Sequence, residues 1–184
     1  MSLVITGNPG VGKHTVAKLV AKKLDLKLID INKVVMQKGI FEKSQGTLNV
    51  DVIKLKKTLG KLITKDSIVV GHLAPYVVPR KQVKLVIILR RNPYKLISVY
   101  KKRGYSHQKS IENIGSEILG IIYYDSIKGF GSDRTLQLNT TGKSVGIIVK
   151  KITDLFTKDT ISEDEVDWLG LISEKNDLKR FFPY

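Results

Sequence analysis

The sequence predicts an α/β fold with three layers, in which a parallel β-sheet of about five strands lies between helices. Short apolar runs rich in β-branched residues alternate with amphipathic helical stretches along the chain, which is the pattern of such a sheet. The run at residues 84–89 (KLVIIL) is apolar at nearly every position, as is typical of strands covered on both faces. The 184 residues, 42% of them hydrophobic, suit one domain with a substantial core.

Each predicted element follows from a local pattern. The predicted strands are the apolar runs at residues 2–6, 26–31, 67–71, 84–89 and 135–139. The predicted helices have one apolar face or a recognisable start, such as Asp51 as N-cap or Pro93 in the first turn, and cover residues 15–24, 52–63, 93–102, 111–127 and 144–156. Residues 32–50 contain Gly39 and Gly46 and predict short helices and loops.

A change in composition after Lys158 predicts a boundary between a domain at residues 1–158 and a C-terminal extension at residues 159–184. The extension is acidic at residues 162–171, and Ser162 followed by Glu165 resembles the start of a helix. We expect a helical extension that packs on the domain. The alternative is a docking segment for a partner.

The charge balance and the missing residue types limit the classes of function. The chain has 26 Lys, 6 Arg and 17 acidic residues, which give a formal net charge of +15. This charge attracts polyanions such as RNA, although a lysine-rich proteome explains it equally well. The absence of cysteine excludes disulfides and zinc fingers. Without a signal-peptide pattern or a long apolar run, we expect a cytoplasmic protein that does not bind membranes, and a monomer.

Residues 7–15 (GNPGVGKHT) match the phosphate-binding pattern G-x-x-x-x-G-K, directly between the first predicted strand and the first helix. The glycines Gly7, Gly10 and Gly12 allow the backbone to curl so that its N–H groups point inward, and Lys13 reaches the outer phosphates. The alternative, a glycine turn without a ligand, does not account for the lysine. The motif therefore predicts a P-loop NTPase fold that binds ATP.

One position of this loop departs from the pattern, because His14 stands where a Ser or Thr normally binds Mg²⁺. Thr15 follows in the same helical turn, and its hydroxyl can contact phosphate or metal. The order GKHT is similar to the GKGT of adenylate kinases, which hold Mg²⁺ largely through the nucleotide and water. We therefore expect a working site for ATP and Mg²⁺, with His14 pointing outward.

Two further predicted strands end in polar residues, at the edge of the sheet where α/β proteins bind ligands. His72 follows the strand at residues 67–71, and Arg90 and Arg91 follow the strand at residues 84–89. We expect His72 at the site and at least one arginine facing phosphates. The alternatives are a buried core histidine and a pair of surface arginines.

Three longer segments, together with the loop, resemble one family. They are residues 68–79 (IVVGHLAPYVVP), 85–93 (LVIILRRNP) and 101–126 (KKRGYSHQKSIENIGSEILGIIYYDS). They are similar to the adenylate kinase isoenzyme 6 family, atypical nucleoside monophosphate kinases of archaea and eukaryotes that are linked to maturation of the small ribosomal subunit. The resemblance covers about residues 2–156 and implies an acceptor-nucleotide segment at about 30–52 and a lid at about 102–112.

The resemblance also implies site residues. The ATP-phosphate positions fall on Gly10, Gly12, Lys13, His14 and Thr15. The catalytic positions fall on Lys13, on the lid arginine Arg103 and on His72, while Lys143 follows the last strand, where the loop that cradles adenine lies in this family.

One departure from the family concerns the metal. Eukaryotic members have Asp two residues before the histidine that matches His72, whereas this chain has Val70. Asp30, at the end of the second predicted strand, is the nearest replacement, and Thr15 is the other candidate metal ligand. A helix cap is the alternative role of Asp30.

Two classes of function remain open, and the resemblance allows both. The first is an enzyme that transfers the γ-phosphate of ATP to AMP, with weak ATPase activity. The second is a nucleotide-switched ribosome assembly factor with little kinase activity, whose partner is a small-subunit ribosomal protein or rRNA. A P-loop kinase for another nucleotide or metabolite is a weaker alternative.

Overall fold

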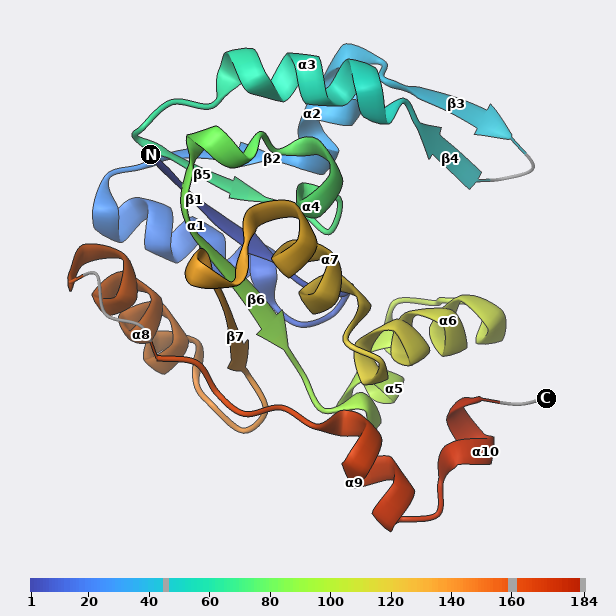
Figure 1. Cartoon of the computed structure of the whole chain (residues 1–184). Helices are drawn as coiled ribbons and strands as arrows, with labels where there is room; N and C mark the ends of the chain where they lie inside the picture. Colours follow the sequence, from blue (N-terminus) through green and yellow to red (C-terminus); the bar gives the residue numbers. More distant parts are fainter. Residues whose placement is uncertain (45–46, 159–161, 183–184) are drawn as a thin grey trace.

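The computed structural model describes residues 1–44, 47–158 and 162–182, and it confirms the predicted three-layer α/β fold (Figure 1). Five parallel strands form one sheet in the order β2-β5-β1-β6-β7. They are β1 (Ser2–Thr6), β2 (Lys27–Asp30), β5 (Ser67–Val70), β6 (Val83–Arg90) and β7 (Thr135–Asn139). All five agree with the predicted strands to within about two residues at each end.

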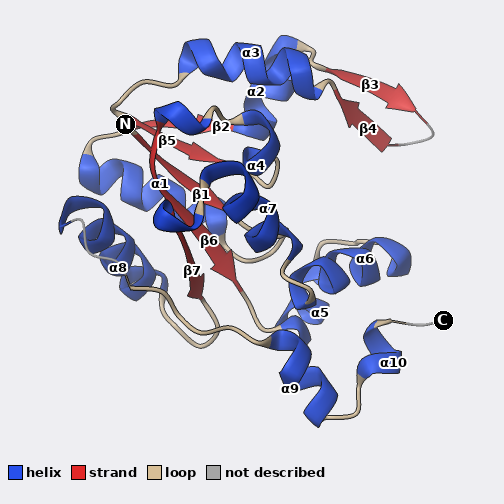
Figure 2. Ribbon diagram, in the orientation of Figure 1, coloured by secondary structure: helices blue, strands red, loops and turns tan. Residues whose placement is uncertain are grey.

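Helices cover both faces of this sheet (Figure 2). On one face lie α1 (Lys13–Leu24), α5 (Pro93–Lys102), α6 (His107–Ile118) and α8 (Val145–Lys158), whose buried residues share a core cluster with Leu3 and Ile5 of β1. On the other face lie α2 (Ile31–Lys38), α3 (Val52–Leu62), α4 (Ala74–Val77) and α7 (Ile121–Phe130), which pack with Val4 of the same strand. The alternation along β1 therefore sends successive side chains into two separate cores.

The structure differs from the prediction at residues 32–50. Instead of short helices and loops alone, this segment contains helix α2 and an antiparallel hairpin formed by β3 (Phe41–Ser44) and β4 (Thr47–Val50). The hairpin stands apart from the main sheet, next to α3 (Figure 1). A strand pair outside the core does not need the continuous apolar run by which buried strands are predicted.

The predicted helix at residues 111–127 is two helices, α6 and α7, which are separated at Gly120. Gly120 has φ of +65°, a left-handed conformation that ends α6 and redirects the chain. The prediction missed this break because the apolar pattern continues on both sides of the glycine. The break is important for the site, because it leaves Glu117 in the last turn of α6.

The C-terminal segment lies against the domain. Residues 162–167 are not helical, so the helix start expected at Ser162 is wrong. Helix α9 (Trp168–Glu174) begins instead after Asp167, whose carboxylate accepts a hydrogen bond from the Gly170 N–H. The short helix α10 (Leu178–Phe181) follows. Trp168 and Phe181 are buried in the core cluster that contains α5 and α6. None of the helices in the described part of the chain has the length and apolar character needed to cross a bilayer.

Candidate active site

The glycine-rich loop connects β1 to α1 and has the backbone that its sequence predicts. Gly7, Gly10 and Gly12 all have positive φ, at 136°, 87° and 95°. A Cβ at Gly7 would lie 2.4 Å from the Leu89 carbonyl oxygen of β6, so this position also requires glycine for space. The loop therefore packs directly on the end of a central strand, and its N–H groups are available together with the N-terminus of α1.

Lys13 is the buried cation of this loop. Its side chain is 5% exposed, and its Nζ donates a hydrogen bond to the backbone carbonyl of Asn8, 3.2 Å away. Burial, followed by the positive charge of Arg103, lowers the pKa of Lys13 to about 8. An anion bound beside Lys13 would offset the cost of burying this charge and would raise the pKa again.

A cleft of 370 Å³ opens above the loop. Seven predicted site residues line it: Gly10, Gly12, Lys13, His14, Thr15, His72 and Arg103. The other lining residues are Pro9, Asn32, Tyr105, Lys109 and Asn113. The structure thus brings the loop, the predicted lid segment and the end of β5 to one cleft.

Aromatic contacts fix the lid segment beside the loop. The Tyr100 hydroxyl of α5 donates to the Pro9 carbonyl at 2.6 Å, and burial raises the pKa of this hydroxyl well above its usual range. The Tyr105 ring stacks on Tyr100 with 5.3 Å between centroids, and the Lys109 ammonium lies 4.4 Å from the Tyr105 centroid. Arg103 therefore sits on a turn whose first end, Tyr100, is bonded to the phosphate loop and whose second end, Tyr105, is stacked on Tyr100.

His14 does not simply point outward. Its Nε2 lies 3.4 Å from an Asp30 carboxylate oxygen, and burial lowers its pKa despite this carboxylate. The other oxygen of Asp30 accepts hydrogen bonds from the N–H groups of Asn32 and Lys33 and caps α2. Asp30 therefore has the capping role that the sequence left open, and it also connects helix α2 to the loop.

The metal assignments stay predictions. The described residues contain no group of three or more His, Cys, Asp or Glu side chains arranged to hold a metal ion. Asp30 is close to the loop but lies beside His14, while Thr15 is exposed at the cleft. Oxygen donors of this kind fit a Mg²⁺ ion that is bound mainly by a nucleotide and water, with one or two protein oxygens nearby.

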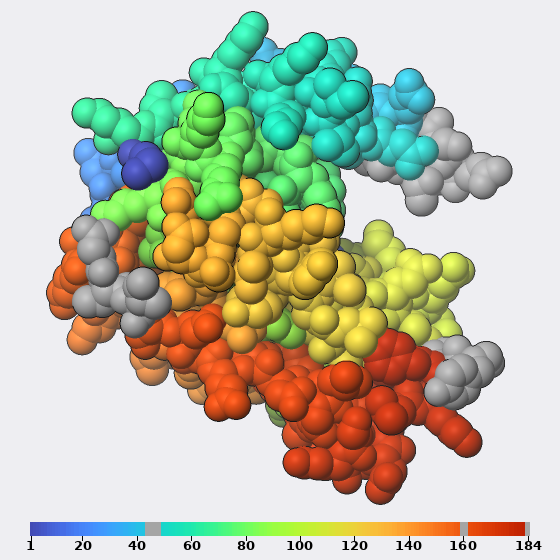
Figure 3. Space-filling view, viewed as in Figure 1, coloured from blue at the N-terminus to red at the C-terminus, as the bar shows by residue number. Residues whose placement is uncertain are grey.

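A second cleft, of 630 Å³, adjoins the first and shares Asn32, His72 and Lys109 with it. Its remaining lining comes from α2, β4, the start of α3 and the loop after β5, as Val35, Met36, Asn49, Val50, Val52 and Leu73. Figure 3 shows the surface hollowed between the cyan segment that contains β4 and α3 and the yellow-green α6. The segment predicted to bind an accepting nucleotide, residues 30–52, forms one wall of this hollow. His72, half-buried with a pKa lowered by burial, lies where the two clefts meet.

Other predicted residues have different surroundings. Arg90 is 4% exposed and paired with Glu117 at 2.9 Å, and Arg91 donates from its guanidinium to the Gly10 carbonyl. Neither arginine lines either of the two clefts. Arg91 contacts the loop directly, and Arg90 supports it through Glu117, which also holds Asn8. The Lys143 ammonium is held by Asp164 at 2.7 Å, away from both clefts, although its loop contacts the phosphate loop through Thr140 and Val11.

The sequence analysis missed Glu117. This carboxylate is 0% exposed and accepts hydrogen bonds from the Asn8 amide, the Arg90 guanidinium and the Trp168 indole. A glutamate in an amphipathic helix normally lies on the solvated face, so the residue type alone does not predict that Glu117 is buried. Only the break at Gly120 and the packing of α9 reveal that Glu117 faces inward.

The fold and this site define a P-loop nucleotide-binding protein in which the cleft over the phosphate loop adjoins a second cleft. Residues 3–120 match the family model described as an AAA domain. Over 176 residues the chain is 31% identical to a protein of Thermococcus kodakarensis named "Putative adenylate kinase", covering 95% of this chain and 96% of that protein. A protein of Pyrococcus furiosus with the same name is 33% identical over 180 residues, covering 95% and 94%. The chain therefore belongs to the AAA-domain family and to the same family as these archaeal proteins. The match to the archaeal proteins extends into the C-terminal segment.

Solved structures agree with the fold. A shikimate kinase from Acinetobacter baumannii in complex with shikimate has a TM-score of 0.59 at 18% identity and covers 88% of this chain and 95% of its own. A deoxyadenosine kinase from M. mycoides has a TM-score of 0.55 at 16% identity and covers 86% of this chain and 100% of its own. At these identities the likeness concerns the fold alone.

Proposed function

We propose that this protein is a nucleoside monophosphate kinase that transfers the γ-phosphate of ATP to AMP and produces two ADP. The observation that carries the proposal is that two clefts adjoin and share Asn32, His72 and Lys109, one over the phosphate loop and one against residues 30–52. A phosphoryl group bound by the loop would thus face an acceptor in the second cleft. The names of the archaeal relatives support the same activity.

The second cleft suits a nucleoside monophosphate. Its walls combine apolar side chains, Val35, Met36 and Leu73, with the amides of Asn32 and Asn49. Apolar walls would hold a base by stacking and contact, and amides would recognise its polar edge. The ammonium of Lys109, which lines both clefts, would pair with phosphate on either side.

The reaction needs positioning and charge more than a base. A phosphate oxygen of the acceptor forms a bond to the γ-phosphorus of ATP while the bond to the β-phosphate oxygen breaks, and ADP leaves. Lys13, Arg103 and the N–H groups of the loop would neutralise the charge on the transferring group. His72, at the junction of the clefts, would donate a hydrogen bond to phosphate. Bound Mg²⁺, near Thr15 and Asp30, would neutralise further phosphate charge.

ATP would lie with its phosphates on the loop and its adenine toward residues 139–144. The contact between Thr140 and Val11 supports this direction, because it places that segment against the phosphate loop. The Lys143 ammonium is held by Asp164 and would not itself contact the adenine. The backbone and methylene groups of Lys143 would make that contact instead. Weak ATP hydrolysis would follow when water replaces the acceptor.

A coupled assay tests the proposal directly. Purified protein with ATP and Mg²⁺ is given AMP, CMP, UMP or GMP, and also shikimate as a metabolite acceptor, and ADP formation is followed. We expect AMP to give the highest kcat/KM. If none of the nucleotides raises ADP formation above the rate measured without an acceptor, the result would contradict nucleoside monophosphate kinase activity. Preference for a non-nucleotide acceptor would favour the metabolite alternative.

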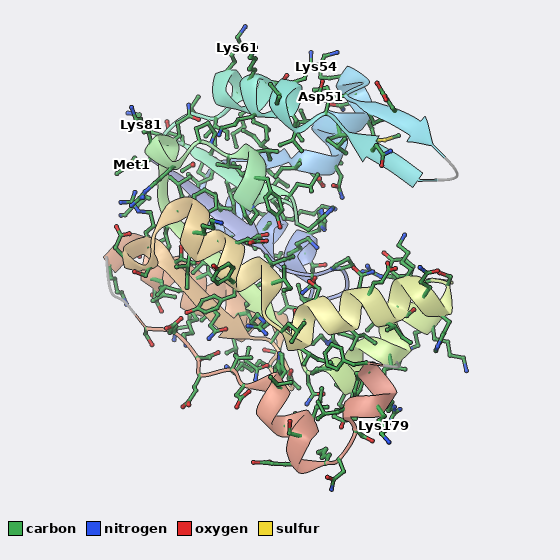
Figure 4. The ribbon with its side chains drawn as sticks, turned by 45° about the vertical axis from the view of Figure 1, so that its right-hand side comes forward. Met1, Asp51, Lys54, Lys61, Lys81 and Lys179 are labelled. Carbon is green, nitrogen blue, oxygen red and sulfur yellow. The ribbon has the colours of Figure 1, made fainter. Side chains whose placement is uncertain are left out.

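A basic groove supports a second candidate, a ribosome assembly factor. Lys38, Lys54, Lys57 and Lys61 surround a groove of 360 Å³ on α2 and α3, and none of the four has an ion pair with a described carboxylate. Figure 4 shows Lys54 and Lys61 on the outer side of α3. Unpaired lysines at this density suit a phosphate backbone such as that of rRNA.

Binding to a small-subunit ribosomal protein or rRNA at low and high salt, with and without ATP, tests the second candidate. An assembly factor should retain a partner above about 0.3 M salt, and ATP should change the affinity. Loss of all binding at that salt, whatever the nucleotide, would leave only nonspecific attraction of polyanions.

A further inference from the structure

The buried carboxylate of Glu117 joins three parts of the chain that are far apart in sequence. Its Oε2 accepts from the Asn8 amide of the phosphate loop at 2.8 Å. Its Oε1 accepts from the Arg90 Nε at 2.9 Å and from the Arg91 N–H at 2.9 Å, both at the end of β6. The same oxygen accepts from the Trp168 indole N–H of α9 at 3.1 Å. A carboxylate with no solvent exposure is thus fully surrounded by donors.

Asn8 extends this connection to the cation of the site. Its amide oxygen accepts a hydrogen bond from the Ser116 hydroxyl at 3.1 Å, and its backbone carbonyl accepts from Lys13 Nζ at 3.2 Å. The hydrogen bonds therefore run without a gap from Trp168 through Glu117 and Asn8 to Lys13. None of Trp168, Glu117 and Asn8 lines the cleft above the phosphate loop.

The other described attachments of the C-terminal segment do not involve Glu117. Tyr94 of α5 donates its hydroxyl to Asp177 at 2.6 Å, and its ring meets Phe181 edge to face at 5.2 Å. Asp164 accepts from the Asn139 N–H and pairs with Lys143 and Lys151. Among these described attachments, the indole of Trp168 is the contact with the carboxylate that holds Asn8.

We propose that Glu117 is a positioning residue for the phosphate loop, and that Trp168 is the contact through which the C-terminal segment sets the order of this loop and its affinity for ATP. The physical reason is the shared carboxylate. A hydrogen bond to Oε1 fixes the orientation of the whole planar group, and that orientation determines where Oε2 holds Asn8. The effect on ATP rests on the proposed function, whereas the effect on loop order does not.

Trp168→Phe is the main test, because it removes the N–H while keeping an aromatic ring in the core. Glu117 then keeps its partners Arg90, Arg91 and Asn8, so no charge is left unpaired. Glu117→Gln is the less useful variant, because it would leave the Arg90 guanidinium buried without its counter-charge and can prevent folding. Tyr94→Phe is the matched control, since it also removes one hydrogen bond to the C-terminal segment but does not touch Glu117.

The first measurement is hydrogen–deuterium exchange of the peptide that covers residues 7–13, in protein without nucleotide. We expect faster exchange in Trp168→Phe than in the wild type, and wild-type exchange in Tyr94→Phe. This measurement does not depend on whether the protein is a kinase. Unchanged exchange in Trp168→Phe, or an equal increase in Tyr94→Phe, would overturn the proposal.

The second measurement is a double-mutant cycle on the dissociation constant for ATP. We expect Trp168→Phe to weaken ATP binding by about threefold to tenfold. In an Asn8→Ala background the same substitution should have a smaller effect, because the hydrogen bond from Glu117 to Asn8 is already removed and, among the described residues, only the contact of Arg91 with Gly10 still joins Glu117 to the loop. The KM of the acceptor should change less than the affinity for ATP. Effects that multiply in the double variant would show that Trp168 acts independently of Asn8 and would overturn the proposal.

Discussion

The Lys13 ammonium donates a hydrogen bond to the Asn8 carbonyl, 3.2 Å away and within the same loop. The cation that a phosphate-binding loop offers to its ligand is thus held by the backbone of the loop itself. Because Asn8 is in turn held by Glu117, the position of the cation depends on α6 as well as on the loop.

Lys13→Met should reduce ATP-dependent phosphoryl transfer by about 10³-fold or more, because it removes the cation that faces the transferring group. The protein should remain folded, since methionine fills a similar volume. Initial rates of ADP formation measure the effect, and Lys18→Met, on an exposed part of α1, is the control. Transfer that is unchanged in Lys13→Met would contradict the phosphate-loop assignment.

The same substitution should stabilise the protein at pH 7. The pKa of Lys13 is about 8 in the folded protein and 10.5 in the unfolded chain, so the unfolded chain binds more protons between these values. Burial of the charged form therefore opposes folding by up to about 3 kcal/mol below pH 8.

The difference in the free energy of unfolding between Lys13→Met and the wild type should consequently decrease as the pH rises from about 8 to 10.5. Urea denaturation at a series of pH values measures it. A difference that is constant over this range would mean that Lys13 does not titrate there.

Arg103→Ala should lower kcat by about 10³-fold with a much smaller effect on the affinity for ATP, as expected for a charge that acts mainly in the transition state. Lys102→Ala, which removes a neighbouring exposed cation outside the described clefts, is the matched control. Kinetics and equilibrium binding of ATP separate the two effects. If affinity falls as much as kcat, Arg103 binds the ground state and the assignment is wrong.

Met36→Glu should raise the KM for the nucleoside monophosphate by about tenfold while the affinity for ATP stays the same. Met36 lines the second cleft, where a carboxylate would repel an anionic acceptor. Gln37→Glu adds the same charge to the neighbouring exposed position and should leave the KM near its wild-type value. Equal effects of the two variants would argue against an acceptor site in this cleft.

Gly120→Ala should destabilise the protein by about 1 kcal/mol, because alanine disfavours the left-handed conformation at φ of +65°. Gly60→Ala, within helix α3, should instead stabilise it by up to about 1 kcal/mol, because the added Cβ would lie 3.7 Å from the Pro79 side chain, an ordinary van der Waals contact. Thermal denaturation compares the two. A stabilising Gly120→Ala would contradict the conformation that divides α6 from α7.

The sequence alone determined the α/β fold, the five strands and the phosphate loop. These features depend on short-range patterns: apolar runs for buried strands, glycines at fixed spacing, and a lysine at the start of a helix. The same patterns did not indicate the hairpin at β3 and β4 or the division at Gly120. A strand pair outside the core lacks a continuous apolar run, and a single glycine does not interrupt an apolar periodicity.

Only the tertiary structure decided how the site is supported. Arg90 and Glu117 are ordinary charged letters in the sequence, yet they form a buried pair, 5% and 0% exposed, that holds Asn8. Asp30 is both a helix cap and the partner of His14, because β2 ends beside the start of α1. Such roles arise when distant segments meet in a low-dielectric interior, where each buried charge requires a partner. The identity of that partner depends on packing, which no local pattern in the chain encodes.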